Sequence, residues 1–128
     1  MSTLNVATVK SLSSSAPVFQ NTSGVEKGQL AKAWINFDGS GTIAIRDSFN
    51  VSSITDVTTG RYTVAFTTSV GAGYCVVSSG HFYETTVTGN VREVGANNLA
   101  TGSYMLNVSY NGSTNQDAEN VFSAVFGD

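Results

Sequence analysis

The chain has 128 residues, a net charge of −3 and only 12% charged residues, about half the proportion found in an average soluble domain. Its six basic residues are scattered and form no stripe for phosphates, its apolar runs are too short to span a membrane, and its single cysteine excludes an intrachain disulfide. We therefore expect no nucleic-acid partner and no membrane insertion, and no signal peptide because no basic region precedes an apolar run at the start.

Residues 1–29 differ from the rest of the chain in having few large apolar side chains. The first ten residues alternate as one thin strand, Pro17 suits an edge or a connection, and residues 18–27 are typical of a short hairpin around Asn21 to Gly24. One copy of such a segment would struggle to offset about 1–2 kcal/mol per residue of backbone ordering. We interpret residues 1–29 as a segment for attachment or intertwining, ahead of a β domain over residues 30–128.

Three runs between residues 30 and 77 alternate in the way that half-buried strands do. The runs are residues 31–37, 42–46 and 61–67. In the first, Ala33, Ile35 and Phe37 share one face while Trp34 and Asn36 take the other. The segments 38–41 and 56–60 between these runs are rich in Asp, Thr and Gly, which favours turns.

The same stretch resembles a known family. The blocks Ala33–Thr42, Ile45–Asp56 and Gly60–Thr68 are similar to a module of bacteriophage tail fibres and related virion proteins, of the type found in phages of marine bacteria and cyanobacteria. The resemblance covers roughly residues 30–80. It implies a small β domain that assembles as a homotrimer, and residues 1–29 resemble the leader that precedes the module in short phage proteins.

The carboxy-terminal half contains further strand patterns. Residues 73–78 and 81–88 indicate strands, and residues 89–101 indicate a loop or a ragged strand. Alternation is clearest over residues 104–110, which precede the hairpin signal Asn111-Gly112. The last strand, residues 120–126, is largely apolar on both faces, so we expect it to be covered on both sides, in part by a neighbouring subunit.

Eight or so short strands spaced about ten residues apart predict an all-β protein. We expect a single antiparallel β-sandwich or jelly-roll-like domain with an extended N-terminal arm. Edge strands in such sheets are usually protected by charge. Because charge is scarce here, we expect the edges to be paired in an oligomer.

The residues that could carry chemistry are few and unpartnered in sequence. His81 is the only histidine, and Cys75 lies in an apolar run that favours a small core residue over a nucleophile. The segment Asp38 to Gly41 lacks the alternating acids and closing Glu of a calcium loop, so it is read as a plain turn. Asp47, Asp56, Asp117 and Glu119 are the acids considered for a glycosidase pair, with nothing to place two of them at the required separation. We expect no enzyme activity, no metal and no cofactor.

Binding is the remaining class of function. Tyrosine combines a flat apolar ring with a polar tip, and Tyr74, Tyr104 and Tyr110 lie in the half where the resemblance fades. For Tyr104 a place in the core is favoured. A receptor-binding surface is predicted on loops of this half, at the residues His81, Phe82, Tyr83, Gly95, Asn97 and Asn98.

These observations predict a non-enzymatic virion structural protein, a module of a tail fibre or short fibre exposed on the mature phage particle after synthesis in the host cytoplasm. It would join other virion proteins through residues 1–29 and could contribute to binding of a host surface glycan or protein. One alternative is a capsid decoration or cement protein that stabilises the phage head. A weaker alternative is a glycan-degrading spike.

Overall fold

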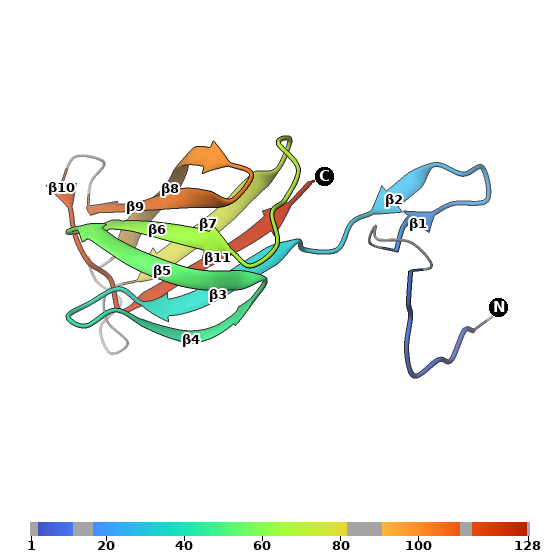
Figure 1. Ribbon diagram of the computed structural model, residues 1–128, viewed down its shortest axis with the longest axis horizontal. Helices are drawn as coiled ribbons and strands as arrows, with labels where there is room; N and C mark the ends of the chain where they lie inside the picture. Colours follow the sequence, from blue (N-terminus) through green and yellow to red (C-terminus); the bar gives the residue numbers. More distant parts are fainter. Residues whose placement is uncertain (1–2, 12–16, 82–90, 111–113, 128) are drawn as a thin grey trace. The chain divides into compact units, whose positions relative to one another are not determined.

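The structure, a computed structural model, describes residues 3–11, 17–81, 91–110 and 114–127 (Figure 1). The chain divides into two units, Met1–Leu30 and Ala31–Asp128. None of the described residues is helical, and accordingly no helix among them is long and apolar enough to cross a membrane.

The first unit contains one hairpin. Strands β1 (Phe19–Gln20) and β2 (Glu26–Gly28) pair antiparallel. The Asn21 carboxamide oxygen accepts the backbone N–H groups of Ser23 and Val25, at 3.1 and 2.9 Å. Gly24 takes the left-handed conformation, with φ 75°, which lets the chain reverse. This hairpin agrees with the sequence-based prediction.

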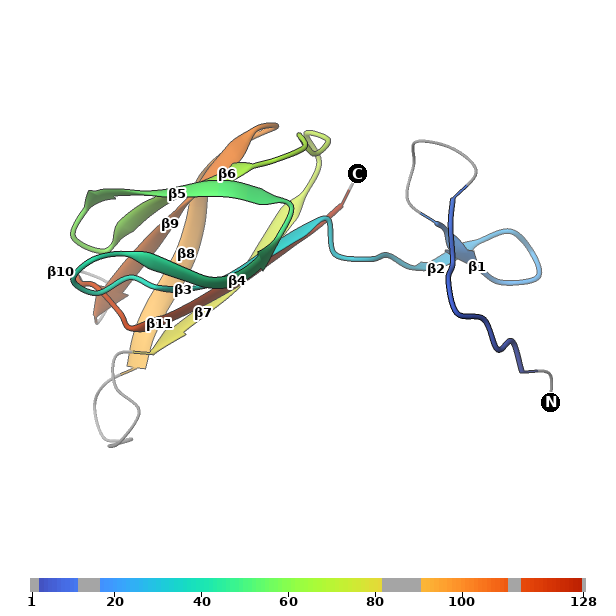
Figure 2. The same cartoon turned by 60° about the horizontal axis from the view of Figure 1, so that its bottom comes forward.

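The second unit is one antiparallel sheet that curls into a nearly closed, barrel-like sandwich (Figure 2). Its strand order is β4-β3-β11-β7-β8-β9-β6-β5, with β10 paired to β9. The strands are β3 (Ala33–Asp38), β4 (Ala44–Phe49), β5 (Val51–Thr58), β6 (Arg61–Phe66), β7 (Cys75–His81), β8 (Val91–Ala100), β9 (Ser103–Tyr110), β10 (Thr114–Asn115) and β11 (Asn120–Phe126). The predicted all-β antiparallel sandwich is confirmed.

Two layers face each other across the core. One layer is β4-β3-β11-β7 and the other is β8-β9-β6-β5. They are continuous at one corner, where β7 and β8 pair, among the described residues, through Gly80 with Arg92 and His81 with Val91. At the other corner β4 and β5 are the two ends of the sheet order, although they follow each other in sequence through Asn50. The connection from β4 to β5 therefore passes from one layer to the other through a single residue.

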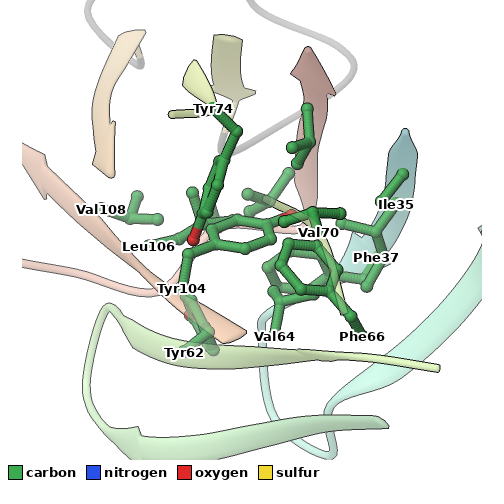
Figure 3. Close-up of a cluster of buried hydrophobic side chains, with 14 residues drawn as sticks. Ile35, Phe37, Tyr62, Val64, Phe66, Val70, Tyr74, Tyr104, Leu106 and Val108 are labelled. Carbon is green, nitrogen blue, oxygen red and sulfur yellow. The ribbon is translucent and has the colours of Figure 1, made fainter. Parts of the chain in front are cut away.

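The core is built from the inward faces of the strands, as the alternation predicts. Phe37 packs edge-on against Tyr62 with ring centroids 5.1 Å apart, and Phe66 contacts Tyr74 and Tyr104 at 5.8 and 5.4 Å (Figure 3). The buried apolar residues are Ala33, Ile35, Phe37, Tyr62, Val64, Phe66, Val70, Tyr74, Tyr104, Leu106, Val108, Ala118, Val121 and Val125. All of them belong to the second unit.

A buried hydrogen bond between two side chains joins the two layers through this core. The hydroxyl groups of Tyr104 on β9 and Ser123 on β11 lie 2.7 Å apart. Both residues are buried, so each hydroxyl depends on the other in place of water. Burial raises the pKa of Tyr104 to about 12, although the hydrogen bond with Ser123 opposes that rise. The expected core position of Tyr104 is confirmed.

Several details differ from the sequence-based predictions. Residues 51–58 form the strand β5. The sequence pattern instead predicts a turn over residues 56–60 and indicates no strand over residues 51–55. The prediction that Cys75 is a core residue is wrong, because the thiol is exposed. The alternation of β7 turns Val76, Ser78 and Gly80 inward and therefore points Cys75 outward. An apolar run of residues does not determine which face of a strand is buried.

Candidate binding surfaces

The predicted receptor-binding residues lie along two strands. His81 ends β7, while Gly95, Asn97 and Asn98 lie within β8 and not in a loop. Phe82 and Tyr83 lie outside the described residues. His81 pairs with Val91, and Asn97 is six residues further along β8, which corresponds to about 20 Å at 3.3 Å per residue. The described members of the predicted site therefore do not form one patch.

A local irregularity explains why this segment has no clear alternation in sequence. The register of β8 against β9 shifts between Asn97 and Ala100, and Asn98 adopts a positive φ of 47°. Such a bulge leaves extra residues unpaired and increases the twist of the strand. The sequence indicated a loop or a ragged strand, and the structure has the strand.

The tyrosines of the carboxy-terminal half are mostly committed to the core. Tyr74 is buried, and its hydroxyl lies 3.0 Å from the carbonyl oxygens of both Ala100 and Ser103, to which it donates. Burial raises the pKa of the Tyr74 hydroxyl. Tyr110 is 37% exposed, and the Arg92 guanidinium lies 5.2 Å from the centroid of its ring. Among these described tyrosines, only Tyr110 offers a ring face near solvent.

The segment Asp38 to Gly41 is a turn, as predicted. The Asp38 carboxylate accepts the backbone N–H and the hydroxyl of Ser40, at 2.9 and 2.7 Å, and pairs with the Arg46 guanidinium at 3.2 Å. Burial raises the pKa of the Asp38 carboxyl, but the bonds from Ser40 and the charge of Arg46 outweigh it, so the pKa is lowered. The carboxylate therefore closes its own turn.

Arg46 extends this network to the end of the neighbouring loop. Its guanidinium donates to the carbonyl oxygens of Phe37 and Glu119, at 3.2 and 2.6 Å, and to the side-chain oxygen of Asn120 at 3.0 Å. These acceptors lie on β3 and at the start of β11. Arg46 thus fastens the edge strand β4 to two segments of the same layer.

Asp117 has a comparable structural role at the same end of the second unit. Its carboxylate oxygen Oδ1 accepts the backbone N–H of Gly60 at 2.7 Å and lies 2.9 Å from the Tyr62 hydroxyl, which also lies 2.8 Å from the Gly39 carbonyl oxygen. Burial, followed by the hydrogen bond and charge of Asp117, raises the pKa of Tyr62 strongly.

The described residues contain no group of three His, Cys, Asp or Glu side chains arranged to hold a metal ion.

Gly60 must be glycine for this connection to form. Its φ is +66°, and a Cβ atom placed there would lie 2.5 Å from the Val108 carbonyl oxygen. The Gly60 carbonyl oxygen also accepts the Val108 N–H at 2.7 Å. The tight β5–β6 turn, β9 and the loop before β11 are therefore joined at one point.

The most distinctive surface lies on the outward side of β3, β11 and β7. In register, Phe49, Trp34, Ala124 and Val77 form one row across four strands, and Asn36, Phe122 and Ser79 form the next. Phe49 is 54% exposed, Val77 is 62% exposed and Phe122 is 42% exposed. We call this surface the apolar outer face and define it by Trp34, Phe49, Val77, Phe122 and Ala124.

A shallow groove of about 440 Å³ runs over this face. Its outward lining residues include Trp34 and Val77 on either side of Ala124, together with Phe122 and Asn36. The small side chain of Ala124 accounts for the hollow between its larger neighbours. The Oδ1 atom of Asn36 is shielded from water there and has no hydrogen-bond partner.

The opposite layer has a different outward face. Its β6 and β9 rows are polar apart from Met105, since Thr63 pairs with Met105 and Arg61 with Asn107. Thr55 and Asn97 continue the first of these rows on the flanking strands. The opposite layer also has the exposed apolar side chains of Val57 and Leu99, but the contiguous apolar rows lie on the layer of β4, β3, β11 and β7.

Sequence reasoning identified part of this surface. The two-sided apolar character of residues 120–126 indicated it, whereas Trp34 and Val77 could not be assigned to the same face without knowing that β11 lies between β3 and β7.

No protein-family model, no curated protein and no solved structure matches the chain.

Proposed function

We propose that this chain is a non-enzymatic structural protein of a bacteriophage virion, a tail-fibre or short-fibre module that works by assembling with copies of itself and with other virion proteins. The resemblance over Ala33–Thr68 supplies the virion context and the expected homotrimer. The mature particle is then its location. The structure supports the assembling role through the distribution of apolar side chains.

The main support for this proposal is the exposure of the side chains in the first unit. Apart from Ser11 and Pro17, every described residue from 3 to 30 is exposed, and none is buried. The exposed large apolar residues include Leu4, Val6, Val9, Val18, Phe19, Val25 and Leu30. Such a segment gains little from burial within its own unit. Contact with another chain would supply the missing burial.

The polar groups of the second unit support a structural role over a catalytic one. Asp38 and Asp117 each accept hydrogen bonds that close turns or join loops. The hydroxyls of Tyr62, Tyr74 and Tyr104 are each bonded within the fold. These hydrogen bonds give each polar group a structural role that does not involve a substrate.

Binding of a host surface glycan or protein by the carboxy-terminal half stays part of the proposal. It would involve His81, which ends β7, with Phe82 and Tyr83 next to it in sequence, and Gly95 to Asn98 on β8. Since the described residues are spread along the strand, contact with a receptor would have to be extended or would use only one of the two groups.

Quantitative mass spectrometry of purified virions tests the proposal. A tail-fibre module should be present in tens of copies per particle, whereas hundreds of copies would favour the capsid decoration protein. A chain that is absent from particles would contradict a virion role altogether. Release of reducing sugar from host polysaccharide by the purified chain would contradict the non-enzymatic assignment and favour the glycan-degrading spike.

A further inference from the structure

We propose that the apolar outer face is the contact surface between the second unit and a second copy of this chain. This inference rests on the proposed assembling role and specifies which part of the domain carries it. The face lies outside the segment that supports the proposed function, residues 1–29, and no catalytic or receptor-binding prediction includes it.

The shape of the face suits a packed protein contact. Phe49, Trp34, Ala124 and Val77 lie on adjacent strands about 4.8 Å apart, so their row is about 14 Å wide. Phe122 lies one row along, beside the hollow over Ala124. A large apolar side chain from another molecule would fill that hollow, as side chains do at the packed centre of an interface.

Given the proposed self-association, the charge distribution points to this face as the place where two copies meet. The chain carries a net charge of −3, and its second unit contains eight acidic and four basic residues, so two copies repel each other over most of their surfaces. None of the five residues of the apolar outer face is charged, and Asp47 lies only at its rim, opposite Asn36. Two copies can meet at this face without placing like charges against each other.

The exposed area is consistent with an interface shared among copies. Phe49, Phe122 and Val77 are 54%, 42% and 62% exposed and Trp34 is half-buried, so at roughly 150–250 Å² for a large side chain they form an apolar patch of about 300–400 Å². A stable two-chain interface uses about 800 Å² from each partner. The face therefore supplies about half of the requirement, and the exposed apolar side chains of residues 3–30 are a second source of area for the same assembly.

The test compares three variants of the full chain. Val77→Glu and Phe122→Glu place a charge on the apolar outer face, and Val57→Glu is the matched control, because Val57 is 50% exposed on β5 in the opposite layer. Each variant is first checked for a wild-type circular dichroism spectrum and melting temperature. Association is then measured by sedimentation velocity over a dilution series.

We expect each variant on the face to weaken association by roughly thirtyfold or more, the effect of losing one interface hot spot, while Val57→Glu associates like the wild type. Wild-type association by both face variants, or equal weakening by Val57→Glu, would overturn the assignment of this face and leave the assembling role intact. A wild type that is monomeric at every concentration would instead overturn the assembling role itself.

A second readout needs no substitution. Cys75 is the only cysteine, its thiol is exposed, and it lies opposite Phe126 at the margin of the face. Its reaction with a maleimide should be slower in concentrated wild-type protein than in dilute protein, and should lose that dependence in Val77→Glu. A rate independent of concentration in an associated wild type would contradict a contact at this face.

Discussion

Asp117 is the residue that joins the loops at one end of the second unit. Its carboxylate accepts both the Gly60 N–H and the Tyr62 hydroxyl. Asp117→Ala leaves a part-buried donor without its acceptor, so we expect the free energy of unfolding to fall by about 1–3 kcal/mol. Chemical denaturation measures this change. Asp56→Ala, at an exposed position on β5, is the control and should change stability by less than about 0.5 kcal/mol. Equal effects of the two substitutions would contradict the role given to Asp117.

The buried tyrosines make the fold sensitive to alkaline pH. The pKa of Tyr104 is raised from 10.0 to about 12, and those of Tyr62 and Tyr74 are raised as well. A raised pKa means that the folded state favours the neutral hydroxyl, so the stabilisation is complete below pH 10 and is lost as the pH rises from 10 towards 12. Tyr104 should contribute a loss of about 1.4 kcal/mol per pH unit in that window, and Tyr62 and Tyr74 should add to it in the same direction.

Tyr104→Phe isolates the contribution of one tyrosine to this alkaline sensitivity. The variant should be less stable at pH 8, by about 1–2 kcal/mol, because the Ser123 hydroxyl loses its buried partner. Between pH 10 and 12 its stability should fall less steeply than that of the wild type. Urea denaturation at several pH values measures both slopes, and identical slopes would show that the Tyr104 hydroxyl ionises as readily in the folded protein as in the unfolded chain.

At the scale of single residues, sequence reasoning succeeds where a residue acts locally. The Asp38 turn could be predicted because its hydrogen bonds reach only two residues along the chain. The bond from Gly60 to Asp117 could not, because the two residues are 57 positions apart. Cys75 was misplaced because a run of apolar residues does not reveal the phase of a strand's alternation.

At the scale of elements, Asn50 holds the crossing from β4 to β5. Its side-chain N–H groups donate to the carbonyl oxygens of Lys32 and Thr68, both at 3.0 Å, and its Oδ1 accepts the Thr68 N–H at 2.8 Å. Asn50 also adopts a positive φ of 54°. We expect Asn50→Gly to lose about 1–3 kcal/mol from the missing bonds. Asn50→Ala should lose about 1 kcal/mol more, because alanine strains the left-handed conformation.

Thermal or urea denaturation of both variants checks this order. Ser52→Ala is a control in the same region, since the Ser52 hydroxyl makes only long bonds of 3.2 Å to the carbonyl oxygens of Ala65 and Phe66. If Asn50→Ala had the same free energy of unfolding as Asn50→Gly, the positive φ at position 50 would not destabilise alanine there.

Strand prediction succeeded where one face is buried and the other is wet. β3, β6, β9 and β11 alternate in this way, and their sequence patterns matched the observed strands within a few residues. β5 was missed because its register against β6 shifts twice, between Val51 and Ser53 and between Asp56 and Thr58. Each shift interrupts the period of two on which the prediction depends. The apolar outer face depends on strand order, which alternation does not contain.

At the scale of the whole molecule, the two units should differ in their need for partners. In the part of the chain that the structure describes, the buried apolar core lies within residues 31–128. A chain of residues 31–128 should therefore fold alone, with a β-type circular dichroism spectrum and a melting temperature within a few degrees of the full chain, yet fail to enter virions. Loss of folding on this deletion, together with a monomeric full-length chain, would refute the role of residues 1–29 in assembly.

We propose that this chain assembles with copies of itself. Sedimentation equilibrium of the full-length protein measures its mass in solution directly, independent of shape. With a chain mass of 13.4 kDa, the proposed homotrimer should give a species of three times that mass at micromolar concentrations, dissociating on dilution. A single species of 13.4 kDa at every concentration would contradict it.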